Sequence, residues 1–276
     1  MMESKDWLLQ ELQEIKKWEN DQKGLWFWEK IGRLPFKLLD KITPEFIQKK
    51  IGLLLDELGN FIQNGGKYLT QEKLVIQKAQ KYAEDSSIDS PKQLALLPIH
   101  TMDQISEDLK KGRETVATLQ GATTGIGGIF TLAIDIPVLL GLSLKTLQEI
   151  AIAYGYDPTD RKERVFIVKC LQFSSADIVG KEAILNELAS FNERKQSKEV
   201  MSQLQGWREV VYTYRDNFGW KKLLQMVPLA GMVFGAFTNR SMIRDLSETG
   251  MMLYRKRRIL ERLNEENELT EIPEKI

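Results

Sequence analysis

Hydrophobic positions recur every three or four residues along almost the whole chain, which is the spacing of one face of an α-helix. Glycine and proline fall between these stretches, and the alternating pattern of a β-strand is hard to find. We therefore predict an all-α fold. Pro98 is predicted to break one helix, and the charged segment 192–199 is predicted to be a surface segment or loop. The predicted helices cover residues 5–20, 44–63, 70–82, 91–97, 104–120, 138–154, 159–191 and 207 onward.

The stretch 121–142, GATTGIGGIFTLAIDIPVLLGL, carries a single charge, Asp135. It is long enough to cross a hydrocarbon layer of about 30 Å, but Gly, Thr, Asp135 and Pro137 lower its hydrophobicity. A second apolar stretch, 223–238, would cover only about 24 Å as a helix, and Pro228 interrupts it. We therefore favour a soluble or interfacial pair of helices, buried against other helices, over a pair of membrane spans.

Glycines recur in both apolar stretches at a spacing that suits close helix packing. Gly121 and Gly125 lie four residues apart, and Gly231 and Gly235 repeat that spacing. Small residues four apart share one helix face and let another backbone approach. We therefore predict a multi-helix domain in which the two Gly/Ala-rich segments pack together. The run that ends at Gly128 lacks the third glycine of a dinucleotide loop and the Lys-Ser/Thr of a P-loop, which disfavours a nucleotide cofactor.

These two segments resemble the EcsC protein family over about residues 45–262. The first family block ends in Asp-x-Pro and is followed by a helix that ends in Gly-Tyr-Asp. The second is a proline, a Gly/Ala-rich run, an asparagine and a charged helix. The family name comes from a gene set that encodes an ABC transporter, and the resemblance implies a fold rather than a chemistry. The matching residues are Asp135, Pro137, Gly155, Tyr156, Asp157, Pro228, Gly231, Gly235, Ala236, Asn239, Arg244 and Asp245.

The N-terminal segment 1–41 is aromatic, aliphatic and basic, and we separate it from a helical domain at 42–262 and an acidic tail at 263–276. Four of the six tryptophans lie in the first 28 residues. This composition suits the headgroup layer of a membrane, and packing of the tryptophans onto the domain is the alternative. The run 255–258 is interpreted as helix-end charge, with membrane attachment as the alternative. The predicted membrane contacts are Trp26, Phe27, Trp28, Lys30, Arg33 and Lys37.

Composition narrows the class of protein further. Lys plus Arg equals Asp plus Glu at 39 each, so a nucleic-acid partner is not expected. The single cysteine, Cys170, is predicted to be a buried residue of a reducing compartment. The single histidine, His100, is too little for a metal site or a nucleophile–base pair. We predict no metal and no cofactor, and a cytoplasmic location with peripheral attachment at the inner face of the cell membrane.

Asp135 is the best candidate for an acid catalyst, because apolar surroundings raise the pKa of a carboxyl group. Asp157 and Asp245 are its candidate partners in that interpretation. The alternative, which we favour, is a buried ion pair of Asp135 with Arg240 or Arg244, with a hydrogen bond from Asn239. Asp157 precedes Pro158 and is also interpreted as a turn residue.

The predicted function is that of a non-enzymatic, membrane-peripheral helical accessory protein that attends an ABC transporter or another membrane complex. Its partner would be a membrane surface or a membrane protein complex. One alternative is a helical protein that binds a lipid or another apolar ligand between the Gly-rich helices. The other is a carboxylate-dependent hydrolase.

Overall fold

The computed structural model describes residues 3–22, 56–70, 72–125, 132–176, 178–189 and 228–270. These residues are helical and contain no strand, which confirms the predicted all-α fold. Residues 56–64 form one helical stretch. The labelled elements are α1 (Lys5–Asp21), η1 (Gly66–Tyr68), α5 (Lys73–Ala83), α6 (Pro91–Leu94), α7 (Ile99–Gly125), α8 (Leu132–Ala153), α9 (Arg161–Ser175), α10 (Ile178–Ala189) and α12 (Pro228–Thr270).

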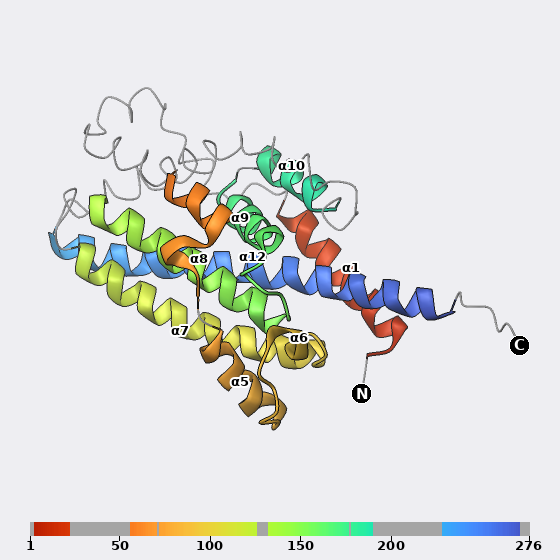
Figure 1. Ribbon diagram of the computed structural model, residues 1–276. Helices are drawn as coiled ribbons and strands as arrows, with labels where there is room; N and C mark the ends of the chain where they lie inside the picture. The colour runs from red at the N-terminus through yellow and green to blue at the C-terminus, as the bar shows by residue number, and fades with distance from the viewer. Residues whose placement is uncertain are drawn as a thin grey trace, which may run out of the picture.

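Helix α12 runs the length of the molecule, and other helices pack along it (Figure 1). Its most extensive contact is with α7. Gly121 of α7 touches Gly235, and Asp103 of α7 pairs with Arg255, so the two helices are antiparallel. Helix α8 follows α7 in the chain and packs against both.

Helix α1 belongs to the main hydrophobic core. Leu8, Leu12 and Ile15, which the sequence places on one face, are buried in the same cluster as residues of α8, α9 and α12. Ser4 caps the helix by accepting a hydrogen bond from the backbone N–H of Trp7. The predicted membrane contacts at residues 26–37 lie outside the described residues.

Several predicted helix boundaries are confirmed and others differ, among them the start of α7, which was predicted at residue 104. The helix before Gly65 ends there, where φ is 76°, and α7 begins directly after Pro98. The helix predicted to resume after Pro137 in fact begins at Leu132, so Pro137 lies inside α8. A proline in the second turn removes only one backbone hydrogen bond, which a well-packed helix tolerates. Helix α12 continues to Thr270, into the predicted tail, because Glu and Leu there are good helix formers.

Candidate functional site

The two Gly/Ala-rich segments meet at a backbone-to-backbone contact. A Cβ added to Gly121 would lie 2.1 Å from the carbonyl oxygen of Gly235 and 2.8 Å from the nitrogen of Ala236. The predicted packing of the two segments is therefore confirmed, with Gly121 and Gly235 as the contact. Gly125 is the last residue of α7, and Gly231 lies in the first turn of α12. The surroundings of both glycines, and Gly128 itself, lie outside the described residues.

The same part of the bundle is nearly free of charge, and we call it the apolar end. It consists of residues 115–125 of α7, 132–144 of α8 and 228–239 of α12, in which Asp135 is the one charged residue. These stretches lie together because Gly121 meets Gly235 and because α8 packs against α7 and α12 (Figure 1). The next turn carries an ion pair, in which Arg240 Nε donates to Glu114 Oε2 at 3.0 Å.

Large hydrophobic side chains of the apolar end face solvent. Val116 is 45% exposed, Leu119 63%, Val138 48% and Phe237 68%. Threonine hydroxyls of α7 in this region donate to carbonyl oxygens three or four residues earlier in the same helix. The donors are Thr115, Thr118, Thr123 and Thr124. The hydroxyl donors are thus satisfied without water.

Within the described residues, no helix is both long and apolar enough to cross a membrane. The apolar end is therefore composed of shorter stretches that lie side by side, two without a charge and one with Asp135 alone. Each belongs to a helix whose other half carries charged residues.

The arginines that were predicted to pair with Asp135 are engaged by other carboxylates. Arg240 binds Glu114, and the Nε of Arg244 lies 3.5 Å from Asp245 Oδ1 at the surface. The side chain of Arg244 is 53% exposed. The side chain of Asp135 itself lies outside the described residues.

Asn239 is fully buried in the part of α12 where the apolar end stops. Neither its amide nitrogen nor its amide oxygen has a hydrogen-bond partner in the structure. An unpaired buried polar group costs roughly 1–3 kcal/mol, so this side chain lowers stability where it stands. Unpaired buried groups of this kind mark sites that are retained for reasons other than stability.

We expect Asn239→Leu to raise the free energy of unfolding by about 1 kcal/mol, because it removes an unsatisfied amide and keeps the volume. Gln148→Leu is the matched control. Gln148 is equally buried, but its amide donates to the carbonyl oxygen of Tyr68 and accepts from the N–H of Thr70. That control should lose stability by roughly 1–3 kcal/mol. Urea unfolding measures both, and a destabilised Asn239→Leu protein would mean that the amide is satisfied in solution.

Gly155 and Asp157 build the turn that follows α8. Gly155 has φ of +82°, and a Cβ on it would lie 2.4 Å from Cα of Ala95, so both backbone angle and space require glycine. The carboxylate of Asp157 accepts hydrogen bonds from the N–H and the hydroxyl of Thr159, at 2.8 and 2.7 Å. Asp157 is thus a turn residue here, and it follows the C-terminal end of α8, whereas the apolar end contains the N-terminal half of that helix.

The basic run 255–258 is part of the interior framework of the protein. Arg255 pairs with Glu11 and Asp103, and Lys256 pairs with Glu19. Two nitrogens of the Arg258 guanidinium donate to the carbonyl oxygen of Tyr154, at 3.0 and 2.7 Å, near the C-terminus of α8. These bonds fix α12 to α1, α7 and α8. The interpretation of this run as helix-end or membrane-facing charge was therefore wrong.

Arg257 completes this framework at a buried carboxylate. Its Nη1 donates to Glu163 Oε2 at 2.8 Å, and the hydroxyl of Tyr254 donates to Glu163 Oε1 at 2.5 Å. The guanidinium carbon lies 4.0 Å from the centre of the Tyr156 ring. Burial raises the pKa of Glu163, and Arg257 and Tyr254 oppose that rise only in part.

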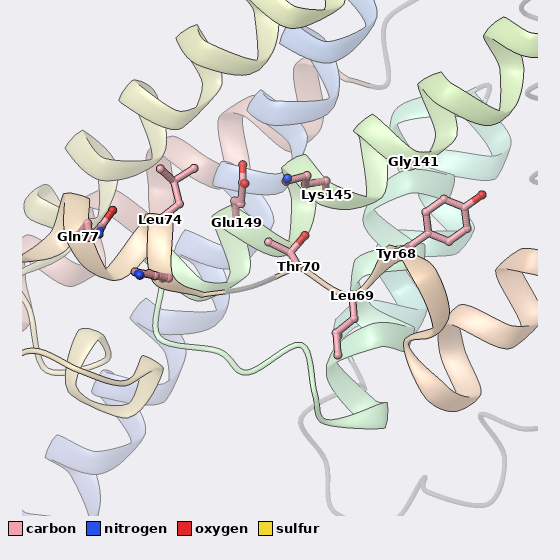
Figure 2. A pocket seen from close by; sticks show the side chains of 9 residues that line it. Tyr68, Leu69, Thr70, Leu74, Gln77, Gly141, Lys145 and Glu149 are labelled. Carbon is pink, nitrogen blue, oxygen red and sulfur yellow. The ribbon is translucent and has the colours of Figure 1, made fainter.

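A groove separates α5 and η1 from α8, with a volume of about 530 Å³ (Figure 2). Gly141, Lys145 and Glu149 lie on one face of α8, four residues apart. The opposite wall is formed by the end of η1, by residues 69 and 70, and by α5. Its lining residues are Tyr68, Leu69, Thr70, Lys73, Leu74 and Gln77.

The walls of the groove are held by buried polar contacts. Arg113 binds both carboxylate oxygens of Glu149, which has a side chain only 1% exposed. The hydroxyl of Tyr68 donates to Glu57, and burial together with this carboxylate raises the pKa of Tyr68. A Cβ at Gly141 would lie 3.1 Å from the Tyr68 ring, so the glycine lets this ring pack against α8.

Groups typical of metal or nucleophilic catalysis are sparse in the part of the chain that the structure describes. No cluster of His, Cys, Asp and Glu there could hold a metal ion. His100 is exposed at the start of α7, and Cys170 is fully buried as predicted, where burial raises the pKa of its thiol.

The described residues define a helical bundle protein with a glycine-mediated helix contact and one apolar end. The family pattern of the EcsC protein family matches residues 9–259, so the chain belongs to that family. It is 63% identical over 263 residues to "Uncharacterized protein YdbA" of Bacillus subtilis (strain 168), covering 95% of this chain and 97% of that protein. It is 26% identical over 183 residues to "Protein EcsC" of the same organism, covering 66% of this chain and 75% of that protein. No solved structure matches the chain.

Proposed function

We propose that this protein is a non-enzymatic, membrane-peripheral helical protein that inserts its apolar end into one leaflet of a bilayer. The observation that carries the proposal is the length over which α7 and α12 carry no charge in the apolar end. In α12 it spans 12 residues, 228–239, and in α7 it spans 11, 115–125. At 1.5 Å per residue these are roughly 16–18 Å, close to half of a hydrocarbon layer of about 30 Å.

The surface chemistry of the apolar end supports the same proposal. Phe237 and Leu119 are more than half exposed, which is costly in water and favourable in lipid. The internally bonded threonine hydroxyls need no water, as hydrocarbon requires. Charged residues begin at Glu114 and Arg240, where the headgroup layer would lie.

The structure offers less support for a hydrolase. Such an enzyme would need two or more carboxylates that converge in a cleft. One carboxylate, Glu149, lines the described groove, and Arg113 neutralises it. An accessory role beside a membrane complex is compatible with leaflet insertion, since the apolar end would also bring the charged half of the bundle close to such a complex.

We expect Phe237→Asp to reduce binding to neutral phosphatidylcholine vesicles at least tenfold. An Asp in the hydrocarbon layer costs about 2.5–3.5 kcal/mol, and the loss of Phe adds to that cost. Leu96→Asp is the matched control, because Leu96 is 71% exposed, as Phe237 is 68% exposed, but follows α6 outside the apolar end. Flotation of vesicles on a density gradient measures the bound fraction.

Salt separates leaflet insertion from attraction to charged headgroups. Insertion of an apolar surface into neutral vesicles should persist in high salt, whereas attachment through the basic residues of segment 23–41 should weaken. Equal binding of the wild type, Phe237→Asp and Leu96→Asp proteins would overturn the proposal. So would a wild-type protein that fails to bind neutral vesicles at any salt concentration.

A further inference from the structure

Two lysines line the groove between α5 and α8. Lys73 and Lys145 both line it, both are exposed, and neither pairs with a carboxylate of the described residues. The lining carboxylate, Glu149, already shares both of its oxygens with Arg113. No carboxylate of the lining is left to balance the two ammonium groups, and the N-cap residue of α5, Glu72, adds a negative charge just outside the lining.

The N-terminus of α5 adds backbone donors to the same wall. Its N-cap residue, Glu72, makes no side-chain hydrogen bond to the first turn. The free N–H groups of a first turn and the positive end of the helix dipole favour an anion. Lys73 and Leu74, which belong to this turn, line the groove.

The wall of the groove also holds a buried polar group without a partner. The hydroxyl oxygen of Thr70 is buried and has no hydrogen-bond partner in the structure, although Thr70 lines the groove. The backbone of Thr70 is fixed, because its N–H donates to Gln148 Oε1 at 3.0 Å and Gln148 also binds the carbonyl oxygen of Tyr68. Figure 2 shows Thr70 across the groove from Lys145. The backbone of this wall is thus fixed, and the hydroxyl, which has no exposed surface, would reach a ligand in the groove by rotation of the Thr70 side chain.

We propose that this groove binds the phosphate group of an anionic ligand, with Lys73, Lys145 and the N-terminus of α5 as its recognition elements. A phosphate offers several acceptor oxygens and a charge that matches two ammonium groups. The groove, with a volume of about 530 Å³, accommodates more than the phosphate alone. The rest of the ligand would meet Leu69 and Leu74, which are 40% and 43% exposed.

Two sources can supply this phosphate. One is the headgroup of an anionic phospholipid. Gly141 lines the groove and also belongs to the apolar end, so a lipid in the leaflet beside the apolar end would hold its phosphate at the level of the groove. The other is a free phosphate ester in solution. The two share the recognition chemistry of the groove and differ in whether a membrane is needed.

Titration calorimetry of the full chain with inorganic phosphate and with glycerol 3-phosphate tests the site. We expect the Lys73→Gln/Lys145→Gln protein to bind either ligand at least tenfold more weakly than the wild type. Lys81→Gln/Lys92→Gln is the matched control. It removes the same number of positive charges from exposed lysines, and neither lysine lines the groove. An unchanged affinity in the groove variant, an equal loss in the control, or no binding by the wild type would each overturn the proposal.

Competition then identifies the source of the phosphate. Phosphatidylcholine vesicles that contain phosphatidic acid should displace glycerol 3-phosphate if a lipid headgroup is the ligand. A free phosphate ester is indicated if they do not. Both results support the groove as a phosphate site. Phe237→Asp should leave the titration unchanged, so failure of the leaflet proposal and failure of this one are distinguishable.

Discussion

Gly121→Ala should lower the free energy of unfolding by about 2–3 kcal/mol, although it adds a single methyl group. That methyl would lie 2.1 Å from the carbonyl oxygen of Gly235. Overpacking of this kind typically costs 1–3 kcal/mol, and here the obstacle is backbone, which cannot rotate away as a side chain can. The two helices would have to separate along their most extensive contact. Urea unfolding followed by circular dichroism measures the loss.

Gly112→Ala provides the control on the same helix. A Cβ at Gly112 meets nothing within 4 Å, and the residue is exposed. Alanine is the better helix former, so this variant should gain about 0.5–1 kcal/mol. Opposite signs for the same substitution on one helix are the signature of the glycine contact. Stabilisation by both changes would show that α7 and α12 do not approach so closely.

The glycine contact could be predicted from the sequence because its signal is local. Gly121 and Gly235 each lie in a run of small residues, and a four-residue spacing marks a helix face without knowledge of the partner. The helices themselves were predicted for the same reason, since the period of hydrophobic residues is a property of each segment. The helix start at Leu132 was missed because Pro137 is a strong stop signal that packing overrides.

The partners of charged residues could not be predicted in the same way. Glu163 and Arg257 are 94 residues apart and belong to different helices, and neither stands out among its charged neighbours. Asp135 drew the prediction of an ion pair because it is conspicuous in an apolar run, whereas Arg240 binds Glu114. The groove depends on the placement of η1, α5 and α8 together. Its one local signal is the spacing of Gly141, Lys145 and Glu149 on α8.

Arg257→Met should be the most destabilising change in the charged framework, with a loss of roughly 3–5 kcal/mol at neutral pH. Removal of the guanidinium leaves Glu163, which is buried, with the Tyr254 hydroxyl as its remaining close donor. It also removes the cation stacked on Tyr156. Arg244→Met is the control on the same helix. Arg244 pairs with Asp245 at an exposed position, and its loss should change stability by less than about 1 kcal/mol.

The pH dependence of the Arg257→Met deficit separates lost charge pairing from lost packing. Burial already raises the pKa of Glu163 above its ordinary value of 4.5, and removal of Arg257 raises it further. The folded variant then holds a proton that the unfolded chain releases, so its stability falls as the pH rises from about 4.5 through the raised pKa of Glu163. Below the unfolded pKa both states are protonated, and the deficit should shrink to the packing loss alone. The double variant Glu163→Leu/Arg257→Met, which buries no charge, should lose this pH dependence and recover much of the stability. A deficit that is constant between acid and neutral pH would mean that Arg257 acts through its contacts with the aromatic rings and not through Glu163.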